Sequence, residues 1–303
     1  MRTTDTGLAV AALFESGFAQ VRTDDNSQSL RVIRHYFNLL LSDPAAKAAF
    51  TISPELYQRD EVGEPYELGI LTKKQGGTKE GAAVGFFDQA AGRKTDDPNK
   101  EQFHFSTDLY SLVIPSWKMR YYPFLFAISE LNHSAITLVH ELVAECDRMN
   151  ATLPKERAYE AVLSERLGSM VAITRLIRYG EVEGDLPDAK VHRDRDFLTV
   201  HHYSSQPGLV LFDKDKRQHC CDETSPYSAI VFTGEKFWVV TRGKFGPGAV
   251  HGVLDERRKR GSRVGDPRLV AVTFVHIGMM SDDCAWLKEH VGDIKLDQQD
   301  YRL

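Results

Sequence analysis

Cysteine is scarce in this sequence, and no two cysteines have the spacing of a structural metal site. The four cysteines are Cys146, Cys220, Cys221 and Cys284, and none of them belongs to a CxxC pair. Cys220 and Cys221 are adjacent in a polar stretch, so we expect ordinary thiols of a reducing compartment there. The cysteine pattern therefore predicts neither a disulfide scaffold nor a structural zinc site.

The sequence also lacks an excess of basic charge and any long apolar run. Its 38 Lys and Arg residues face 43 Asp and Glu residues, which gives a formal net charge of −5. A basic excess would be expected of a protein that binds nucleic acid through its phosphates. No apolar run approaches the roughly 20 residues of a membrane helix, and Met1 to Thr6 lack a secretory signal pattern. We therefore expect a cytoplasmic protein without nucleic-acid or membrane partners.

Motifs of several large enzyme classes are missing as well. The sequence contains no P-loop, no GxGxxG turn after a strand and no GxSxG nucleophile elbow. The pair His140-Glu141 lacks the second histidine of a zinc-protease HExxH motif, because Ala144 stands in its place. We therefore expect His140 on the surface of a helix, and none of these motifs assigns a function.

What the sequence does contain is helical periodicity in its N-terminal half. With 303 residues, 42% of them hydrophobic, the chain fits one large globular domain or two small ones. Apolar residues recur at three- and four-residue steps between Leu125 and Met149, which predicts a long amphipathic helix. Shorter helical patterns cover Gly7–Glu15, Ser29–Leu41, Ala158–Val171 and Asp282–Val291.

From about Ile173 the pattern changes to short β-branched and aromatic runs separated by turn residues. Short strands with no helix between them favour an antiparallel sandwich or barrel with the N-terminal helices packed outside it, an α+β jelly roll. We divide this single unit into a mainly helical region, 1–172, a jelly-roll core, 173–281, and a C-terminal helix and tail, 282–303. The expected strands are Phe197–Tyr203, Leu209–Phe212, Ala229–Thr233, Phe237–Thr241 and Leu269–His276.

A His-x-Asp tripeptide precedes the first of these strands and suggests a metal site. In an extended chain, His192 and Asp194 project to the same side, so one imidazole and one carboxylate can meet a single ion. His251 follows the next turns, where an antiparallel neighbour could supply a second imidazole. Two histidines and one carboxylate are the ligands of non-haem Fe(II) oxygenases. The tripeptide alone is a weak signal, since Asp196 has the same parity and the competing histidines are His201, His202, His219 and His276.

Longer blocks of sequence surround these residues. In chain order they are Arg175-Leu176-Ile177-Arg178-Tyr179-Gly180, His192-Arg193-Asp194, Phe197-Leu198-Thr199-Val200, Thr241-Arg242-Gly243-Lys244-Phe245 and His251-Gly252-Val253. Their order and spacing resemble the isopenicillin N synthase-like family of Fe(II)- and 2-oxoglutarate-dependent oxygenases. The resemblance extends over most of the chain, because similar sequence is found in Glu15-Ser16-Gly17-Phe18, in the Arg34–Lys47 helix and in Asn99–Phe103. It implies a double-stranded β-helix core and an iron held by His192, Asp194 and His251.

The resemblance also implies a site for 2-oxoglutarate. In that family an Arg-x-Ser pair on a late strand binds the distal carboxylate of the co-substrate, and Arg268 opens such a strand here, with Val270 in place of the serine. The sequence Arg260-Gly261-Ser262 is a second candidate for the Arg-x-Ser pair, although it lies in a charged loop. Tyr179 matches a family tyrosine that faces 2-oxoglutarate, and Ile177 stands where the family often has asparagine.

The function that the resemblance implies is oxidation of a small organic molecule with Fe(II), O2 and 2-oxoglutarate, usually hydroxylation, with release of succinate and CO2. An oxidase that uses iron and O2 without 2-oxoglutarate is an alternative, because Val270 removes a co-substrate contact. A jelly roll that binds metal without redox turnover and a zinc-dependent hydrolase or isomerase are further alternatives. We expect the substrate to contact Leu68–Phe105, which includes the irregular Lys73–Lys100 stretch, and Trp117–Phe126.

Overall fold

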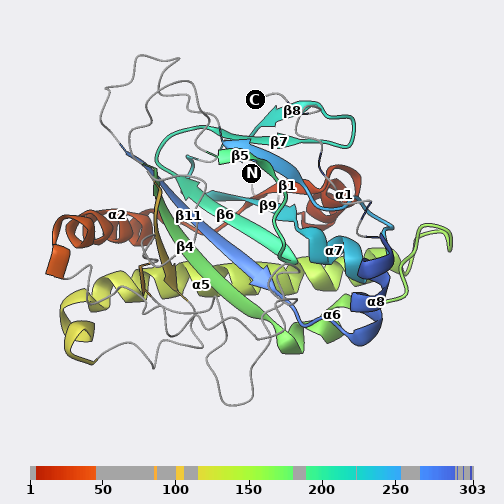
Figure 1. The fold of residues 1–303 in the computed structure, drawn as a ribbon, viewed down its shortest axis with the longest axis horizontal. Coiled ribbons are helices and arrows are strands. Elements are labelled where there is room, and N and C mark those ends of the chain that lie inside the picture. The colour runs from red at the N-terminus through yellow and green to blue at the C-terminus, as the bar shows by residue number, and fades with distance from the viewer. Residues whose placement is uncertain are drawn as a thin grey trace.

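Two antiparallel sheets and a set of helices make up the described part of the chain (Figure 1). The computed structural model describes residues 5–45, 85–86, 100–105, 115–179, 189–222, 224–253, 267–290, 292, 296 and 301. The seven-stranded sheet has the order β1 (Phe18–Arg22), β9 (Ser228–Thr233), β6 (Leu198–Ser204), β11 (Arg268–His276), β4 (Val171–Tyr179), β3 (Lys100–Phe105) and β2 (Gly85–Phe86). The four-stranded sheet has the order β5 (Ala189–His192), β10 (Val250–Val253), β7 (Leu209–Phe212) and β8 (Gln218–Cys220).

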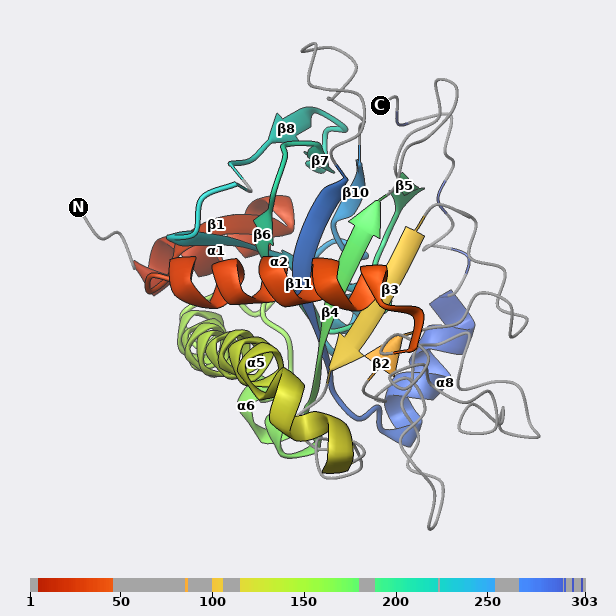
Figure 2. The same ribbon diagram turned by 90° about the vertical axis from the view of Figure 1, so that its left-hand side faces the viewer.

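Helices cover one face of the larger sheet (Figure 2). The described helices are α1 (Thr6–Ser16), α2 (Ser27–Ser42), α5 (Pro115–Asn150), α6 (Leu163–Arg166), the 3-10 turn η4 (Leu167–Ser169), α7 (Glu235–Val240) and α8 (Ser281–His290). The apolar stripe predicted for α5 is buried against the sheet, with Leu131 and Leu142 fully enclosed. Within the described ranges no helix is both long enough and apolar enough to cross a membrane.

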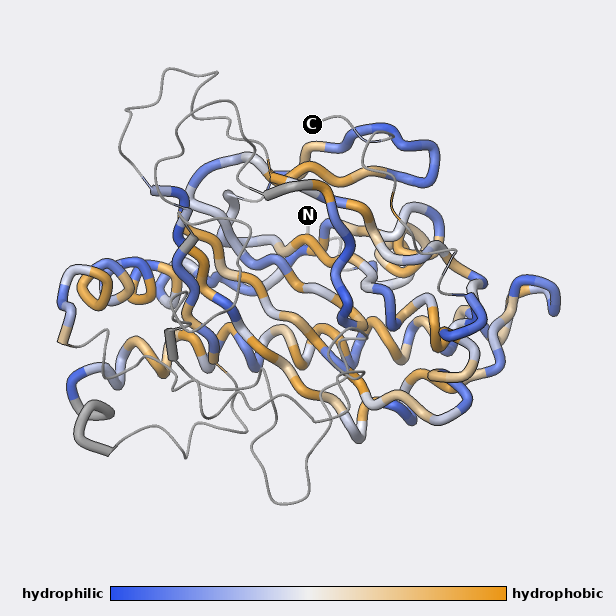
Figure 3. The backbone as a smooth tube through the Cα atoms, viewed as in Figure 1, coloured by the Kyte–Doolittle hydropathy of each residue, from blue (hydrophilic) through white to orange (hydrophobic). Residues whose placement is uncertain are grey.

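The smaller sheet packs on the other face of the larger sheet. Leu209 and Leu211 of β7 meet Ile230 and Phe232 of β9 in one apolar cluster. The alternate residues of β7, Val210 and Phe212, point outward, where Leu296 and Tyr301 pack on them. Figure 3 shows the central strands in hydrophobic colours and the turn between β7 and β8 in hydrophilic ones. The inner faces of the two sheets therefore enclose a layer on the side of the larger sheet away from α1, α2 and α5.

Most of the predicted elements are present. Leu209–Phe212 is a strand over the predicted bounds, and the helices expected at Gly7–Glu15, Ser29–Leu41 and Asp282–Val291 correspond to α1, α2 and α8 within two residues. Strands β1 and β3, which lie within the first 172 residues, pair with β9 and β4 of the larger sheet. The mixture of helices and antiparallel sheet expected from the sequence is therefore confirmed.

Two predicted elements are wrong. The run Phe237–Thr241, predicted to be a strand, forms helix α7, whose residues are buried on all sides. A short, uniformly apolar run has no period that separates a buried helix from a buried strand. The helix expected over Ala158–Val171 is reduced to α6 and η4, and β4 begins at Val171. The stretch Lys73–Lys100 lies outside the described residues except for β2 and Lys100.

Helix α7 begins against the loop that joins β5 to β6. The backbone N–H of Glu235 donates to the Asp194 carbonyl at 2.8 Å, and that of Lys236 donates to the Asp196 carbonyl at 3.0 Å. These bonds satisfy donors of the first helical turn that have no partner inside the helix. Gly234 precedes the helix with φ −96° and ψ 179°, so its backbone is open to any residue, yet a Cβ there would overlap Asp196. Gly234 is therefore required by the close approach of the two segments.

Gly234→Ala should lower the free energy of unfolding by about 3 kcal/mol or more, because the added methyl must displace the backbone of Asp196. Gly168→Ala is the matched control, since no atom lies within 4 Å of a Cβ at that position. Urea unfolding of both variants measures the difference. Equal stabilities would contradict the close approach of α7 to this loop.

Candidate metal centre

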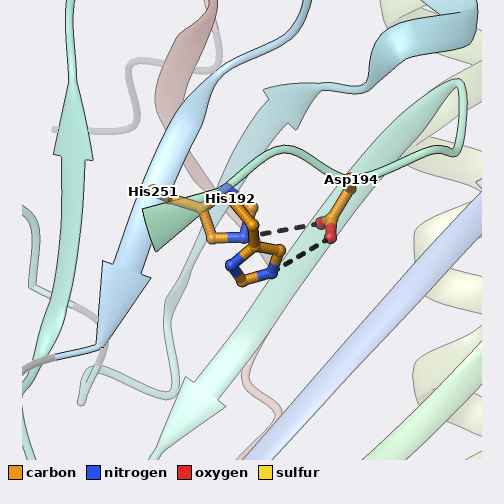
Figure 4. A group of neighbouring side chains, drawn as sticks. All are labelled: His192, Asp194 and His251. Atoms are coloured by element: carbon orange, nitrogen blue, oxygen red, sulfur yellow. Dashed lines mark ion pairs between the residues drawn. The ribbon is translucent and has the colours of Figure 1, made fainter. Parts of the chain in front are cut away.

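The two sheet strands β5 and β10 place His192 and His251 directly opposite each other. Their ring centroids lie 4.3 Å apart. Asp194, two residues beyond the end of β5, turns its carboxylate toward both rings (Figure 4). Its Oδ1 is 3.7 Å from His192 Nε2 and its Oδ2 is 3.7 Å from His251 Nε2. The ligand atoms of the three residues all lie within 4.8 Å of one another, so one metal ion can contact all three.

The register of the strands and the loop after β5 create this grouping. His251 pairs with His192 on one side and with Leu211 of β7 on the other, so its position is fixed by two neighbouring strands. The Asp194 carbonyl is bound by the first turn of α7, as described above. The Arg193 side chain, between the two predicted ligands, interacts with Tyr301 and Glu235 instead. His192 and Asp194 therefore project to the same side of the chain, as expected from the sequence, and Arg193 projects away from them.

His251 is held as a neutral imidazole with one nitrogen available. Its side chain is only 6% exposed, and its Nδ1 lies 3.2 Å from the Ala249 carbonyl, which accepts a hydrogen bond from Nδ1–H. The other nitrogen, Nε2, then has its lone pair directed toward Asp194. Burial, reinforced by the nearby His192, lowers the pKa of His251 to about 4. At neutral pH this imidazole is therefore ready to bind a metal.

Asp194 is an ionised carboxylate in the same surroundings. Burial is the largest influence on its pKa and raises it, but His251, His192, the Thr199 hydroxyl and Arg175 together hold the pKa below its ordinary value. The Thr199 hydroxyl donates to Asp194 Oδ2 at 2.7 Å. A carboxylate with one oxygen fixed in this way presents a defined direction to a metal.

Asp196 is a different kind of carboxyl group. Its side chain is enclosed, and burial together with the charge of Asp194 raises its pKa well above the ordinary value. Its Oδ2 lies 2.6 Å from Thr199 Oγ1. Thr199 has a single hydroxyl proton, so it cannot donate to Asp194 and Asp196 at once. A protonated Asp196 that donates to Thr199, which in turn donates to Asp194, satisfies both contacts.

The other histidines considered in the sequence do not join this group. His201 is buried on the inward face of β6, whereas His202 contacts Thr273 at 2.8 Å in a polar network that reaches Asn132 of α5. His219 pairs with Asp213 in the hairpin of β7 and β8. His276 ends β11, is partly exposed and does not belong to the group of three ligand residues. The predicted triad is therefore the group of three that the structure brings together among the described residues.

Arg268 and Tyr179 are partners across β11 and β4. The Arg268 guanidinium lies 5.4 Å from the centre of the Tyr179 ring, and its Nε donates to the Gln206 carbonyl at 3.1 Å. Arg268 is 1% exposed although its side chain is charged. Val270 and Ile177 stand where the family has serine and asparagine. They are partners across the same two strands, two residues along from the Arg268–Tyr179 pair. Both substitutions therefore belong to one apolar contact beside Arg268 and Tyr179.

Two residues of the site are not predicted by the sequence. Thr199 falls in a predicted strand without a role, although its parity on β6 directs it to the inward face. Lys236 lies in α7, 2% exposed, where burial lowers its pKa to about 8. The second arginine candidate, Arg260-Gly261-Ser262, falls outside the described residues.

Two imidazoles and one carboxylate suit several divalent metals of the first transition row. Three protein ligands do not fill the coordination sphere of such an ion, so positions are left for exogenous molecules. The donor set therefore fits a catalytic metal better than a closed structural one.

No protein-family model matches the chain, and no curated protein matches it. Solved structures do resemble it. A protein from Shewanella oneidensis that is assigned as an oxygenase has a TM-score of 0.64 and 19% identity, over 96% of each chain. A member assigned to the 2OG-Fe(II) oxygenase family from Caulobacter crescentus has a TM-score of 0.60 and 16% identity, over 97% of this chain and 96% of that one. A Neurospora crassa protein, solved with alpha-KG (2-oxoglutarate) and 5-formyluracil, has a TM-score of 0.63 and 11% identity, over 98% of this chain and 84% of that one. The chain therefore has the fold of these proteins.

His251→Ala should weaken the binding of a divalent metal by more than about 100-fold, because even the loss of an outer partner of a ligand costs 10- to 100-fold. His219→Ala is the control, since His219 pairs with Asp213 away from the triad. Equilibrium dialysis with Co(II) measures the affinity, and circular dichroism checks that both variants fold. Full metal binding by His251→Ala would refute the ligand assignment.

Thr199→Val should weaken Co(II) binding by about 10- to 100-fold, because Asp194 Oδ2 loses its donor while the shape of the side chain is kept. Thr199→Ser retains the hydroxyl and should bind the metal nearly as well as the unmodified protein. The visible absorption of bound Co(II) reports whether the ligand geometry changes. If valine and serine behave alike, Thr199 does not orient Asp194.

Proposed function

We propose that this protein is an Fe(II)- and 2-oxoglutarate-dependent oxygenase that oxidises a small organic substrate. The observation that carries the proposal is the convergence of His192, Asp194 and His251 within 4.8 Å. Two neutral imidazoles and a carboxylate are the facial ligand set of non-haem Fe(II) oxygenases. The fold shared with the Caulobacter crescentus and Neurospora crassa proteins supports the same function.

The inward-facing residues fit 2-oxoglutarate at one end of β11 and β4. Arg268 would bind the distal carboxylate of the co-substrate, since a buried guanidinium suits a planar anion. Tyr179 would donate its phenol hydrogen to the same carboxylate, because its ring lies beside the arginine. The serine that the family places two residues after the arginine is Val270 here, which removes a hydrogen bond of about 1 kcal/mol. The Val270–Ile177 contact closes that side of the anion with apolar groups instead.

When bound, iron and 2-oxoglutarate would supply the oxidising power for attack on a substrate C–H bond, with release of succinate and CO2. The protein's own contribution is to bind, orient and enclose. His251 and Asp194 hold their donor atoms in place through Ala249 and Thr199, so little reorganisation is needed. Phe232, whose ring centre lies 4.7 Å from that of His251, belongs to the apolar cluster between the two sheets and limits the entry of water on that side of the metal.

The sheets would then form a double-stranded β-helix, with the smaller sheet facing the larger one across the metal site. We further propose that the helical region, 1–172, the core, 173–281, and the tail, 282–303, act as one unit. The pairing of β1 and β3 with strands of the core supports this arrangement.

Anaerobic titration of the Fe(II)-loaded protein with 2-oxoglutarate tests the proposal. We expect a metal-to-ligand absorption band, and after admission of O2 we expect succinate to form. Arg268→Gln should weaken 2-oxoglutarate binding by about 10- to 100-fold, because a charge-assisted double hydrogen bond is lost. Its iron affinity should be unchanged, since Arg268 is not a metal ligand.

The outcomes separate the alternatives. Oxygen consumption with substrate but no dependence on 2-oxoglutarate would indicate the oxidase alternative. Iron binding with neither an absorption band nor oxygen consumption would contradict the oxygenase proposal. An absorption band that survives in Arg268→Gln with unchanged affinity would refute the role of Arg268 alone.

A further inference from the structure

One end of the inward face of β4 and β11 is partly exposed, whereas Ile177, Val270 and Val272 on the same face are buried. Residues of these strands that face α5, such as Thr174 and Val275, are fully buried. On the opposite face, Arg175, Phe274 and His276 remain partly exposed although they lie within or at the end of central strands. Solvent therefore reaches the inner face at this point, where a small molecule could also bind.

Arg175 is the charged group at this position. Its guanidinium lies over the Phe274 ring, 4.5 Å from the ring centre. An arginine stacked on an aromatic ring keeps the N–H groups at the edge of its plane directed sideways, where they can bind a carboxylate or phosphate. Phe274 is the partner of Thr199 in the sheet, and the Thr199 hydroxyl donates to Asp194 Oδ2 at 2.7 Å, so Arg175 lies on the part of the inward face nearest Asp194.

Arg175 and Arg268 lie at different ends of this face. Both point inward, but Arg175 is the partner of Val272 and Arg268 is the partner of Tyr179, four residues from Arg175 along β4, which is roughly 13 Å in an extended strand. The two guanidinium groups also lie over different rings, that of Arg175 over Phe274 and that of Arg268 over Tyr179. If 2-oxoglutarate occupies the Arg268 end, a second anion would contact Arg175 at the other end of the same face.

The balance of charge in this layer also favours an anion. The cations of this layer and of the loop beside the triad are Arg175, Arg268, Lys236, Arg193 and Arg195, while the acidic groups are Asp194, Asp196 and Glu235. Asp194 would be neutralised by the metal that it binds. A small organic anion therefore meets a positive field here.

We propose that Arg175 is a specificity-determining residue that binds an anionic group, a carboxylate or a phosphate, of the substrate. Phe274 supports the guanidinium and offers an aromatic surface to the rest of the ligand. This inference rests on the proposed function for the oxidation of the ligand, but the binding step requires only the chain itself. The expected substrate class is a small organic acid or phosphate ester with an apolar body.

The test uses ligand-observed NMR titration of the full chain, loaded with Co(II) and saturated with 2-oxoglutarate so that the Arg268 end is filled. The probes are phenylacetate, phenyl phosphate and, as a neutral isostere, 2-phenylethanol. Arg175→Gln should weaken binding of the preferred anion by about 10- to 100-fold, the loss expected for a charge-assisted double hydrogen bond. Arg175→Lys keeps the charge but loses the two parallel N–H donors of the guanidinium. Its affinity for the anion should therefore lie between those of the unmodified protein and Arg175→Gln.

Arg178→Gln is the matched control. Arg178 is on the same strand, but it faces the other side and pairs with Glu101 at 2.9 Å. Its substitution should change anion binding by less than about twofold. Co(II) affinity should be the same in both glutamine variants, which excludes a general loss of structure at the metal triad.

Each outcome has one meaning. Preference for phenylacetate or for phenyl phosphate identifies the anionic group. Equal binding of 2-phenylethanol and both anions, equal effects of the Arg175 and Arg178 substitutions, or no binding of either anion would each overturn the inference. Anion binding lost only in Arg175→Gln, in a protein that forms no succinate, would support this site while contradicting the oxygenase proposal.

Discussion

The contact between the first turn of α7 and the loop after β5 is the constraint on which the metal triad depends. Two N–H groups of α7 bind the carbonyls of Asp194 and Asp196, and Gly234 allows the chains to approach without a side chain between them. This loop would otherwise be a short exposed connection with a mobile carboxylate. Because the helix fixes the backbone on both sides of Arg195, Asp194 is directed toward two histidines on neighbouring strands.

Side chains and backbone groups next to the triad hold its ligand atoms in place. Ala249 fixes the tautomer of His251, and Thr199 connects Asp194 to the buried Asp196. The two carboxyl groups are two residues apart, yet their pKa values move in opposite directions. At Asp194 burial raises the pKa most, but the two imidazoles, the Thr199 hydroxyl and Arg175 together outweigh it, whereas at Asp196 burial and the charge of Asp194 act in the same direction. One position is thus suited to binding a cation and the other to holding a proton.

The two faces of the larger sheet have different roles: one packs on the helices, and the other carries residues of the candidate site. One face packs on α1, α2 and α5 and is mostly apolar; its polar groups include the network of His202, Thr273, Thr174 and Asn132 and the ion pair of Arg178 with Glu101. The other face carries Arg175, Arg268 and His201. Since side chains alternate along a strand, each of the central strands contributes to both. A shift of one residue in register would exchange these roles, so the packing of the helices also fixes the site.

The local sequence pattern was sufficient to predict helices and strands whose apolar residues recur with a clear period. The three- and four-residue spacing of α5 and the compact apolar run of β7 both appear in the structure as expected. It failed at Phe237–Thr241, because a run that is apolar at every position fits a buried helix as well as a buried strand. Contacts with Asp194 and Asp196, some 40 residues earlier in the chain, decide for the helix.

By itself, the sequence determined which residue types were available and which of them share a side: His192 with Asp194, and Arg268 with Val270. It left open which carboxylate and which distant histidine would meet, since Asp196 had the same parity as Asp194 and several other histidines competed with His251. Only the tertiary structure decided for Asp194 and His251, through the register of β5 with β10 and the start of α7. The physical reason is that parity is a property of one strand, whereas a metal site needs strands to be placed side by side, and hydrogen bonds between remote segments set that placement.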